Sequence, residues 1–187
     1  MGIKPKKIIF CGESAGGNLV LALNHLALKA GRKTADGFYL AYPALNAQDN
    51  MVSPSLIRSL DDPMIPVTML KTALECYVGE YRPSQPDPLL STVVTHKEIL
   101  RKFPPVRMVV GDEDPLHDDC WRFMERLKDA GVDAKMRVYK ETPHGLMNVA
   151  FNLIGSGVAK KMVKDGSYVM NGLWKVIREK EGLCDGI

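Results

Sequence analysis

Short apolar runs alternate with longer amphipathic segments along most of the chain. The runs at 7–11, 37–42, 106–110 and 134–139 are each short enough to be a buried strand. Between and after them, apolar residues recur at helical spacing. This alternation predicts an α/β fold, with a mostly parallel sheet flanked by helices.

The helix that follows the first run is expected to be buried and to end before Gly31. Its leucines recur at helical spacing, which predicts that they face the core. These apolar positions are Leu19, Leu23 and Leu26, with Val20 beside them. Further helices are expected to begin near Pro66 and to span about 116–130 and 156–178.

A long excursion, 44–103, separates the second and third predicted strands. It far exceeds the usual connection length, and such insertions are usually functional. The helix expected near Pro66 carries an apolar stripe formed by Leu70, Ala73, Leu74 and Tyr77. Two interpretations of this stripe stay open: packing against the core, or lining of a substrate pocket.

Composition and charge exclude several classes of partner. With 187 residues, 45% hydrophobic and 25% charged, the chain has the composition of one globular domain. A net charge of +3 without an extended basic block argues against nucleic-acid binding. No apolar stretch reaches the length of a membrane span, so at most a peripheral membrane or lipid-droplet contact is expected.

The cysteines favour a reducing compartment. Cys11, Cys76, Cys120 and Cys184 lie far apart and lack the spacing of metal ligands. The chain also shows no secretory leader. We therefore expect free thiols, a cytoplasmic location and no metal site.

The segment Gly12-Glu13-Ser14-Ala15-Gly16 is a G-x-S-x-G motif between a predicted strand and a predicted helix. This context is typical of a nucleophile elbow, in which a sharp turn exposes the serine hydroxyl. An ordinary glycine turn is the alternative.

Candidate partners for Ser14 follow in the order acid, then histidine, which is the order of α/β-hydrolases. The acidic loop containing Asp112 and Asp114 follows the third predicted strand, and His144 follows the fourth. Parallel strands collect such loops at their carboxyl ends. The alternatives are that Asp114 only caps a helix and that His144 only forms a turn.

Several motifs, taken together, resemble the hormone-sensitive lipase family of α/β-hydrolases. They are GESAGGNL at 12–19, Tyr42-Pro43, DDPMIP at 61–66, DPLHDD at 114–119 and PHGL at 143–146. The resemblance implies that Ser14 is the nucleophile, Asp114 rather than Asp112 the acid, and His144 the base. It also makes the Ala15 amide one oxyanion donor, whereas the family's upstream His-Gly-Gly-Gly loop is not found in these 187 residues.

By this resemblance, residues 1–187 form the carboxyl-terminal part of one catalytic domain, a partial α/β-hydrolase fold lacking the amino-terminal strands. The excursion 44–103 would then contact the pocket and its cap. The strand between Lys7 and Cys11 would pair with another copy or with a missing amino-terminal half.

The implied activity is lipase or esterase hydrolysis of an acyl ester or lipid substrate through an acyl-enzyme, without metal or cofactor. The activity of these residues alone is expected to be impaired, because the oxyanion loop is absent. Two alternatives stay open: a ligand-binding protein that has this fold but no catalysis, and a peptidase or amidase with the same triad.

Overall fold

The computed structural model describes residues 5–47, 52–81, 83–145, 147 and 157–179. Four strands form one sheet in the order β1-β2-β3-β4, and all three pairings are parallel. The strands are β1 (Ile9–Glu13), β2 (Gly37–Ala41), β3 (Val106–Gly111) and β4 (Ala134–Tyr139). The predicted parallel α/β architecture is therefore confirmed.

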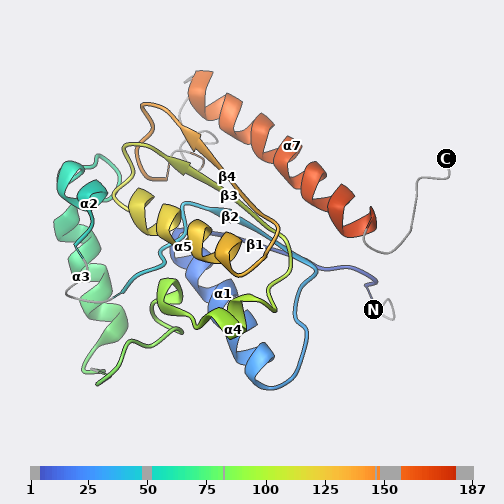
Figure 1. The fold of residues 1–187 in the computed structure, drawn as a ribbon. Helices are drawn as coiled ribbons and strands as arrows, with labels where there is room; N and C mark the ends of the chain where they lie inside the picture. Colours follow the sequence, from blue (N-terminus) through green and yellow to red (C-terminus); the bar gives the residue numbers. More distant parts are fainter. Residues whose placement is uncertain (1–4, 48–51, 82, 146, 148–156, 180–187) are drawn as a thin grey trace.

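Helices cover both faces of this sheet. The helices in the described part of the chain are α1 (Ser14–Lys29), α2 (Pro54–Arg58), α3 (Val67–Val78), the 3₁₀ helix η1 (Thr92–Val94), α4 (Lys97–Leu100), α5 (His117–Asp129) and α7 (Gly157–Glu179). In Figure 1, α1 and α5 lie on one side of the sheet and α7 lies on the other. Because β2 and β3 are covered from both sides, every residue of both strands is buried.

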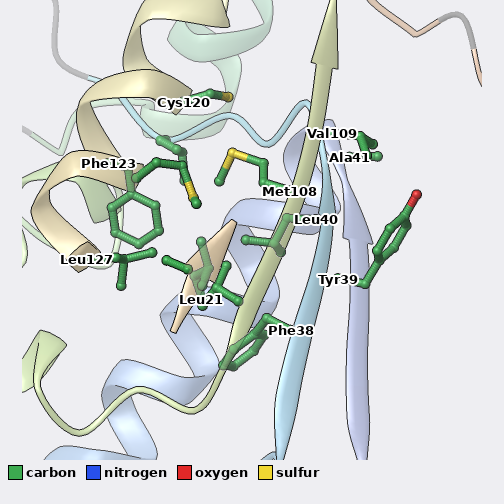
Figure 2. Close-up of a cluster of buried hydrophobic side chains, with 14 of the residues drawn as sticks. Leu21, Phe38, Tyr39, Leu40, Ala41, Met108, Val109, Cys120, Phe123 and Leu127 are labelled. Atoms are coloured by element: carbon green, nitrogen blue, oxygen red, sulfur yellow. The ribbon is translucent and has the colours of Figure 1, made fainter. Parts of the chain in front are cut away.

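The main core lies between the sheet and the pair α1 and α5. Figure 2 shows Phe38, Leu40 and Met108 on this side, facing Leu21 of α1 and helix α5. The α5 residues that reach into this core include Cys120, Phe123, Met124 and Leu127. Each fully buried side chain of this size contributes about 1.5–3 kcal/mol relative to exposure. On the opposite side of the sheet, the Tyr39 ring points toward α7, where Gly166 leaves room for its hydroxyl.

The prediction that the α1 leucines are buried is wrong. Leu19, Leu23 and Leu26 are 55%, 49% and 50% exposed. The buried residues of α1 are instead Gly17, Asn18, Leu21, Asn24 and His25. Two polar groups of this face have partners: the Asn18 Nδ2 donates to the Leu90 carbonyl at 2.8 Å, and the Asn24 Oδ1 accepts from Thr34 at 2.7 Å. Asn18 Oδ1, Asn24 Nδ2 and both ring nitrogens of His25 are buried without a hydrogen-bond partner among the described residues.

The exposed leucines lie beside a strand that has one neighbour. Within the described part of the chain, β1 pairs only with β2, so β1 is an edge of the sheet. Ile8, just before β1, is 38% exposed. We call Ile8, Leu19, Leu23 and Leu26 together the α1 face.

The excursion between β2 and β3 contains α2, α3, η1 and α4. Helix α3 has no buried residue, so its apolar stripe is not part of the core. Within the described residues, the stripe lines the cavity beside Ser14 through Leu70, Ala73, Leu74 and Tyr77.

Candidate active site

Ser14 lies at a sharp turn between β1 and α1. It is the first residue of α1, and its φ of 47° lies in the left-handed region, where a non-glycine residue is strained. A Cβ at Gly12 would lie 2.5 Å from the Gly16 carbonyl oxygen, and one at Gly17 would lie 2.5 Å from the Pro43 Cβ. Gly12 and Gly17 thus allow the strand, the turn and the neighbouring loop to approach closely.

The loops after β3 and β4 also approach closely. A Cβ at Gly111, the last residue of β3, would lie 1.9 Å from the Thr142 carbonyl oxygen. The same carbonyl accepts from the Glu113 amide at 3.3 Å, and the Asp112 amide donates to Tyr139 at 2.9 Å. These contacts hold the acidic loop against the loop that carries His144.

The structure brings Ser14, Asp114 and His144 into one hydrogen-bonded chain. The His144 Nε2 lies 3.0 Å from the Ser14 Oγ, and the His144 Nδ1 lies 2.9 Å from the Asp114 Oδ2. Asp114 is fully buried and His144 is 6% exposed. Because this carboxylate–imidazole pair is buried, solvent ions screen its electrostatic attraction much less than that of an exposed pair.

Asp114 also stabilises the turn before α5, since its Oδ1 accepts from the Leu116 amide at 2.8 Å. Capping alone does not account for Asp114, because the other carboxylate oxygen contacts the imidazole. Asp112 does not take this position: its Oδ1 is buried without a hydrogen-bond partner among the described residues.

Two further side chains contact His144. The Tyr42 ring packs edge-on against the imidazole with centroids 4.9 Å apart, and its hydroxyl donates to the Glu13 carboxylate at 3.3 Å. Burial, reinforced by Glu13, raises the pKa of Tyr42, so its hydroxyl stays protonated at neutral pH. The Asp62 Oδ2 accepts from the His144 backbone amide at 3.1 Å. Sequence reasoning included Tyr42 and Asp62 only within motifs and missed both contacts.

The Ala15 amide belongs to the first turn of α1. Backbone N–H groups in a first turn have no partner within the helix, and the helix dipole favours negative charge there. Ala15 therefore offers a donor next to the Ser14 hydroxyl.

A cavity of about 300 Å³ opens beside Ser14 and Ala15. Most of its wall is apolar and comes from the excursion, through Ile65, Leu70, Ala73, Leu74, Tyr77 and Leu90. A larger cavity of about 600 Å³ lies behind the acidic loop, and neither Ser14 nor His144 lines it. The smaller cavity is thus the one that adjoins the reactive hydroxyl.

The described residues include no group of three or more His, Cys, Asp or Glu side chains that could hold a metal ion. Nor is any helix in the described part of the chain long and apolar enough to cross a membrane.

A family model described as the alpha/beta hydrolase fold matches residues 1–148. A carboxylesterase of Mycobacterium tuberculosis is 29% identical over 150 residues, covering 80% of this chain and 46% of the relative. Human hormone-sensitive lipase is 37% identical over 79 residues, covering 42% of this chain and 7% of the lipase.

Solved structures of esterases have the same fold as this chain. Brefeldin A esterase, described as a bacterial homologue of human hormone-sensitive lipase, superposes with a TM-score of 0.74 at 29% identity, over 89% of this chain and 48% of that one. The chain spans about half the length of the curated esterases it matches.

Proposed function

Because the chain belongs to the alpha/beta-hydrolase fold family, we propose that it carries the catalytic triad of a serine-dependent carboxylic ester hydrolase. The resemblance to the hormone-sensitive lipase family is confirmed by relatives and solved structures of that family. The observation that carries the proposal is the hydrogen-bonded chain Ser14, His144, Asp114 beside an apolar cavity.

In the proposed mechanism, Ser14 attacks the ester carbonyl while the His144 Nε2 accepts its proton. Nε2 can accept only if the proton of the neutral imidazole is on Nδ1, and the 2.9 Å contact with Asp114 favours that tautomer. His144 then returns the proton to the leaving alcohol. The resulting acyl-enzyme is hydrolysed by a water molecule that His144 activates in the same way.

The negative oxygen of the tetrahedral intermediate requires oriented donors. We assign one of them to the Ala15 amide. Since the 187 residues include no His-Gly-Gly-Gly run, we propose that the remaining donors come from another segment and that these residues alone react slowly. Losing one oxyanion donor typically costs about two to three orders of magnitude in rate.

The proposed substrate is an acyl ester or lipid whose apolar chain enters the cavity lined by α3. The apolar wall supports this assignment, because an alkyl chain gains about 0.8 kcal/mol per buried CH₂. We accordingly propose that the excursion 44–103 is the pocket-forming part of one catalytic domain.

We further propose that the α1 face and the β1 edge are covered by a second copy of the chain or by an amino-terminal half. An unpaired strand edge beside exposed leucines favours association. The cytoplasmic location stays a prediction from cysteine usage, and Cys11, Cys76 and Cys120 are free thiols.

The test is covalent labelling with a fluorophosphonate, which reacts with activated serines. We expect one adduct, on Ser14, and none in Ser14→Ala. The reaction is run on two polypeptides: these 187 residues alone, and a longer one that also includes the residues encoded upstream, if they contain a His-Gly-Gly-Gly loop. An adduct on another serine, or equal labelling of Ser14→Ala, would contradict the proposal.

Turnover separates the remaining alternatives. Matched ester and amide substrates of the same acyl group are compared, and we expect hydrolysis of the ester only. Faster amide hydrolysis would favour a peptidase or amidase. Saturable binding of a fatty acyl probe without labelling or turnover would favour the non-catalytic ligand-binding protein.

A further inference from the structure

Asp62 is a buried carboxylate that accepts three backbone hydrogen bonds. Its Oδ1 accepts from the amides of Met64 and Ile65 at 2.8 and 2.7 Å, and its Oδ2 accepts from the His144 amide at 3.1 Å. The residue is 4% exposed. The proposed reaction gives it no role.

The contact with His144 joins two distant parts of the chain, since the residues are 82 positions apart. His144 sits in a turn between Pro143, which has no amide hydrogen, and Gly145, whose φ is 71°. The backbone at His144 is therefore held by a side chain rather than by a strand or helix.

The other oxygen of Asp62 holds the segment that leads into the pocket wall. Ile65 lines the cavity beside Ser14, and α3 begins at Val67. The side chain of Met64 also lies about 3.8 Å from the position that a Cβ on Gly145 would occupy. One carboxylate thus connects the pocket wall with the backbone of the candidate base.

We propose that Asp62 is a positioning residue that fixes the His144 imidazole relative to Ser14 and ties it to the acyl-pocket wall. This inference rests on the proposed function, because positioning has a kinetic consequence only if His144 is the base. Asp62 contacts the backbone of His144 and is not assigned any contact with the reacting atoms.

A narrower role is that Asp62 only closes its own local turn. Asparagine and aspartate commonly accept from amides two or three residues ahead, and such a turn needs one oxygen. That role involves the amides of Met64 and Ile65 but not the amide of His144.

The variant Asp62→Asn separates the two roles. Asparagine keeps one oxygen for Met64 and Ile65, but it places an NH₂ donor opposite the His144 amide, which then lacks an acceptor. The matched control is Asp61→Asn, because Asp61 is the exposed neighbour and loses the same charge.

Amide hydrogen exchange is measured first, since it needs no substrate. In Asp62→Asn we expect exchange at His144 to accelerate by about tenfold or more, as for a buried donor that loses its partner. Exchange at Met64 and Ile65 should change by no more than about threefold. Asp61→Asn should leave all three amides unchanged.

Kinetics are then measured with a short-chain nitrophenyl ester on the full-length protein. We expect Asp62→Asn to lower kcat by about 10- to 100-fold with KM nearly unchanged, because a base displaced by about 1 Å reacts far more slowly while the pocket stays intact. Asp61→Asn should remain near the wild-type kcat.

Unchanged exchange at His144, or unchanged kcat despite faster exchange there, would overturn the proposal. If Asp62→Asn does not fold, amide hydrogen exchange is measured on the wild type. The His144 amide should then be protected from exchange as strongly as the amides of Met64 and Ile65. An unprotected His144 amide would overturn the inference. Failure of the proposed function is seen separately, as a wild type that neither hydrolyses esters nor reacts with the fluorophosphonate.

Discussion

Replacing Gly111 with alanine should inactivate the proposed site through a backbone clash. The added Cβ would lie 1.9 Å from the Thr142 carbonyl oxygen, whereas a Cβ in a folded protein is essentially never within 3.0 Å of a non-bonded heavy atom. The loops that carry Asp114 and His144 must therefore separate by about 1 Å, a displacement that can cost about 100-fold in rate. Overpacking of this kind also destabilises the fold by about 1–3 kcal/mol.

The assay is the rate of fluorophosphonate labelling of Ser14, measured beside a thermal melt. Gly111→Ala should label about 100-fold more slowly or worse and melt at a lower temperature. The matched control is Gly172→Ala in α7, where the added Cβ meets no atom within 4 Å. This control should label normally and melt at the same or a slightly higher temperature, since alanine favours a helix over glycine by about 1 kcal/mol. Wild-type labelling and an unchanged melt in Gly111→Ala would show that the two loops can separate without affecting Ser14.

Two other substitutions test separate parts of the argument. Asp114→Asn should lower the acylation rate by up to about four orders of magnitude, because the imidazole loses its tautomer partner, whereas Asp112→Asn should have little effect; a reversed pair of labelling rates would reassign the acid. Leu23→Glu should weaken self-association of the 187-residue chain in sedimentation experiments, because it places a charge on the α1 face. The control Tyr168→Glu, at a 77% exposed position of α7 on the other side of the sheet, should not; equal effects would remove the α1 face as the contact.

The strands could be predicted because burial on both faces leaves continuous apolar runs, as in β2 and β3. The carboxyl end of β1 could not be predicted from the sequence. The predicted strand stops at Cys11, but Gly12 and Glu13 continue the ladder opposite Leu40 and Ala41. Pairing with a neighbouring strand, which a local pattern does not contain, extends β1 to Glu13, the residue before Ser14.

Helical spacing located α1 but gave the wrong buried face. Its leucines and its polar residues recur at the same spacing, so periodicity alone favours the leucines. The inward side is set by what the rest of the fold presents to the helix. One such contact joins the Asn18 Nδ2 to the Leu90 carbonyl, 72 positions away, and the local pattern does not record it.

The candidate site also contains residues that the sequence predicted and one contact that it did not. Ser14, His144 and the acidic loop were accessible to sequence reasoning because each follows a predicted strand, and parallel strands bring such positions together. The choice of Asp114 over Asp112 within that loop came from the resemblance to the hormone-sensitive lipase family. The contact of Asp62 with His144 was not, because it joins a side chain to a backbone amide across 82 positions. No local pattern records such a contact.

The α1 face and the candidate site share one helix. Ser14 is the first residue of α1, and Leu19, Leu23 and Leu26 lie on the exposed side of the same helix. Leu19 also lines the cavity beside Ser14, so a polypeptide that covers these leucines would lie next to the proposed acyl pocket as well as the β1 edge. Burying the remaining exposed half of each leucine would contribute about 1 kcal/mol per side chain to association. We therefore predict that covering the α1 face changes the rate at which the fluorophosphonate labels Ser14, and an unchanged labelling rate in the associated and dissociated chain would contradict this prediction.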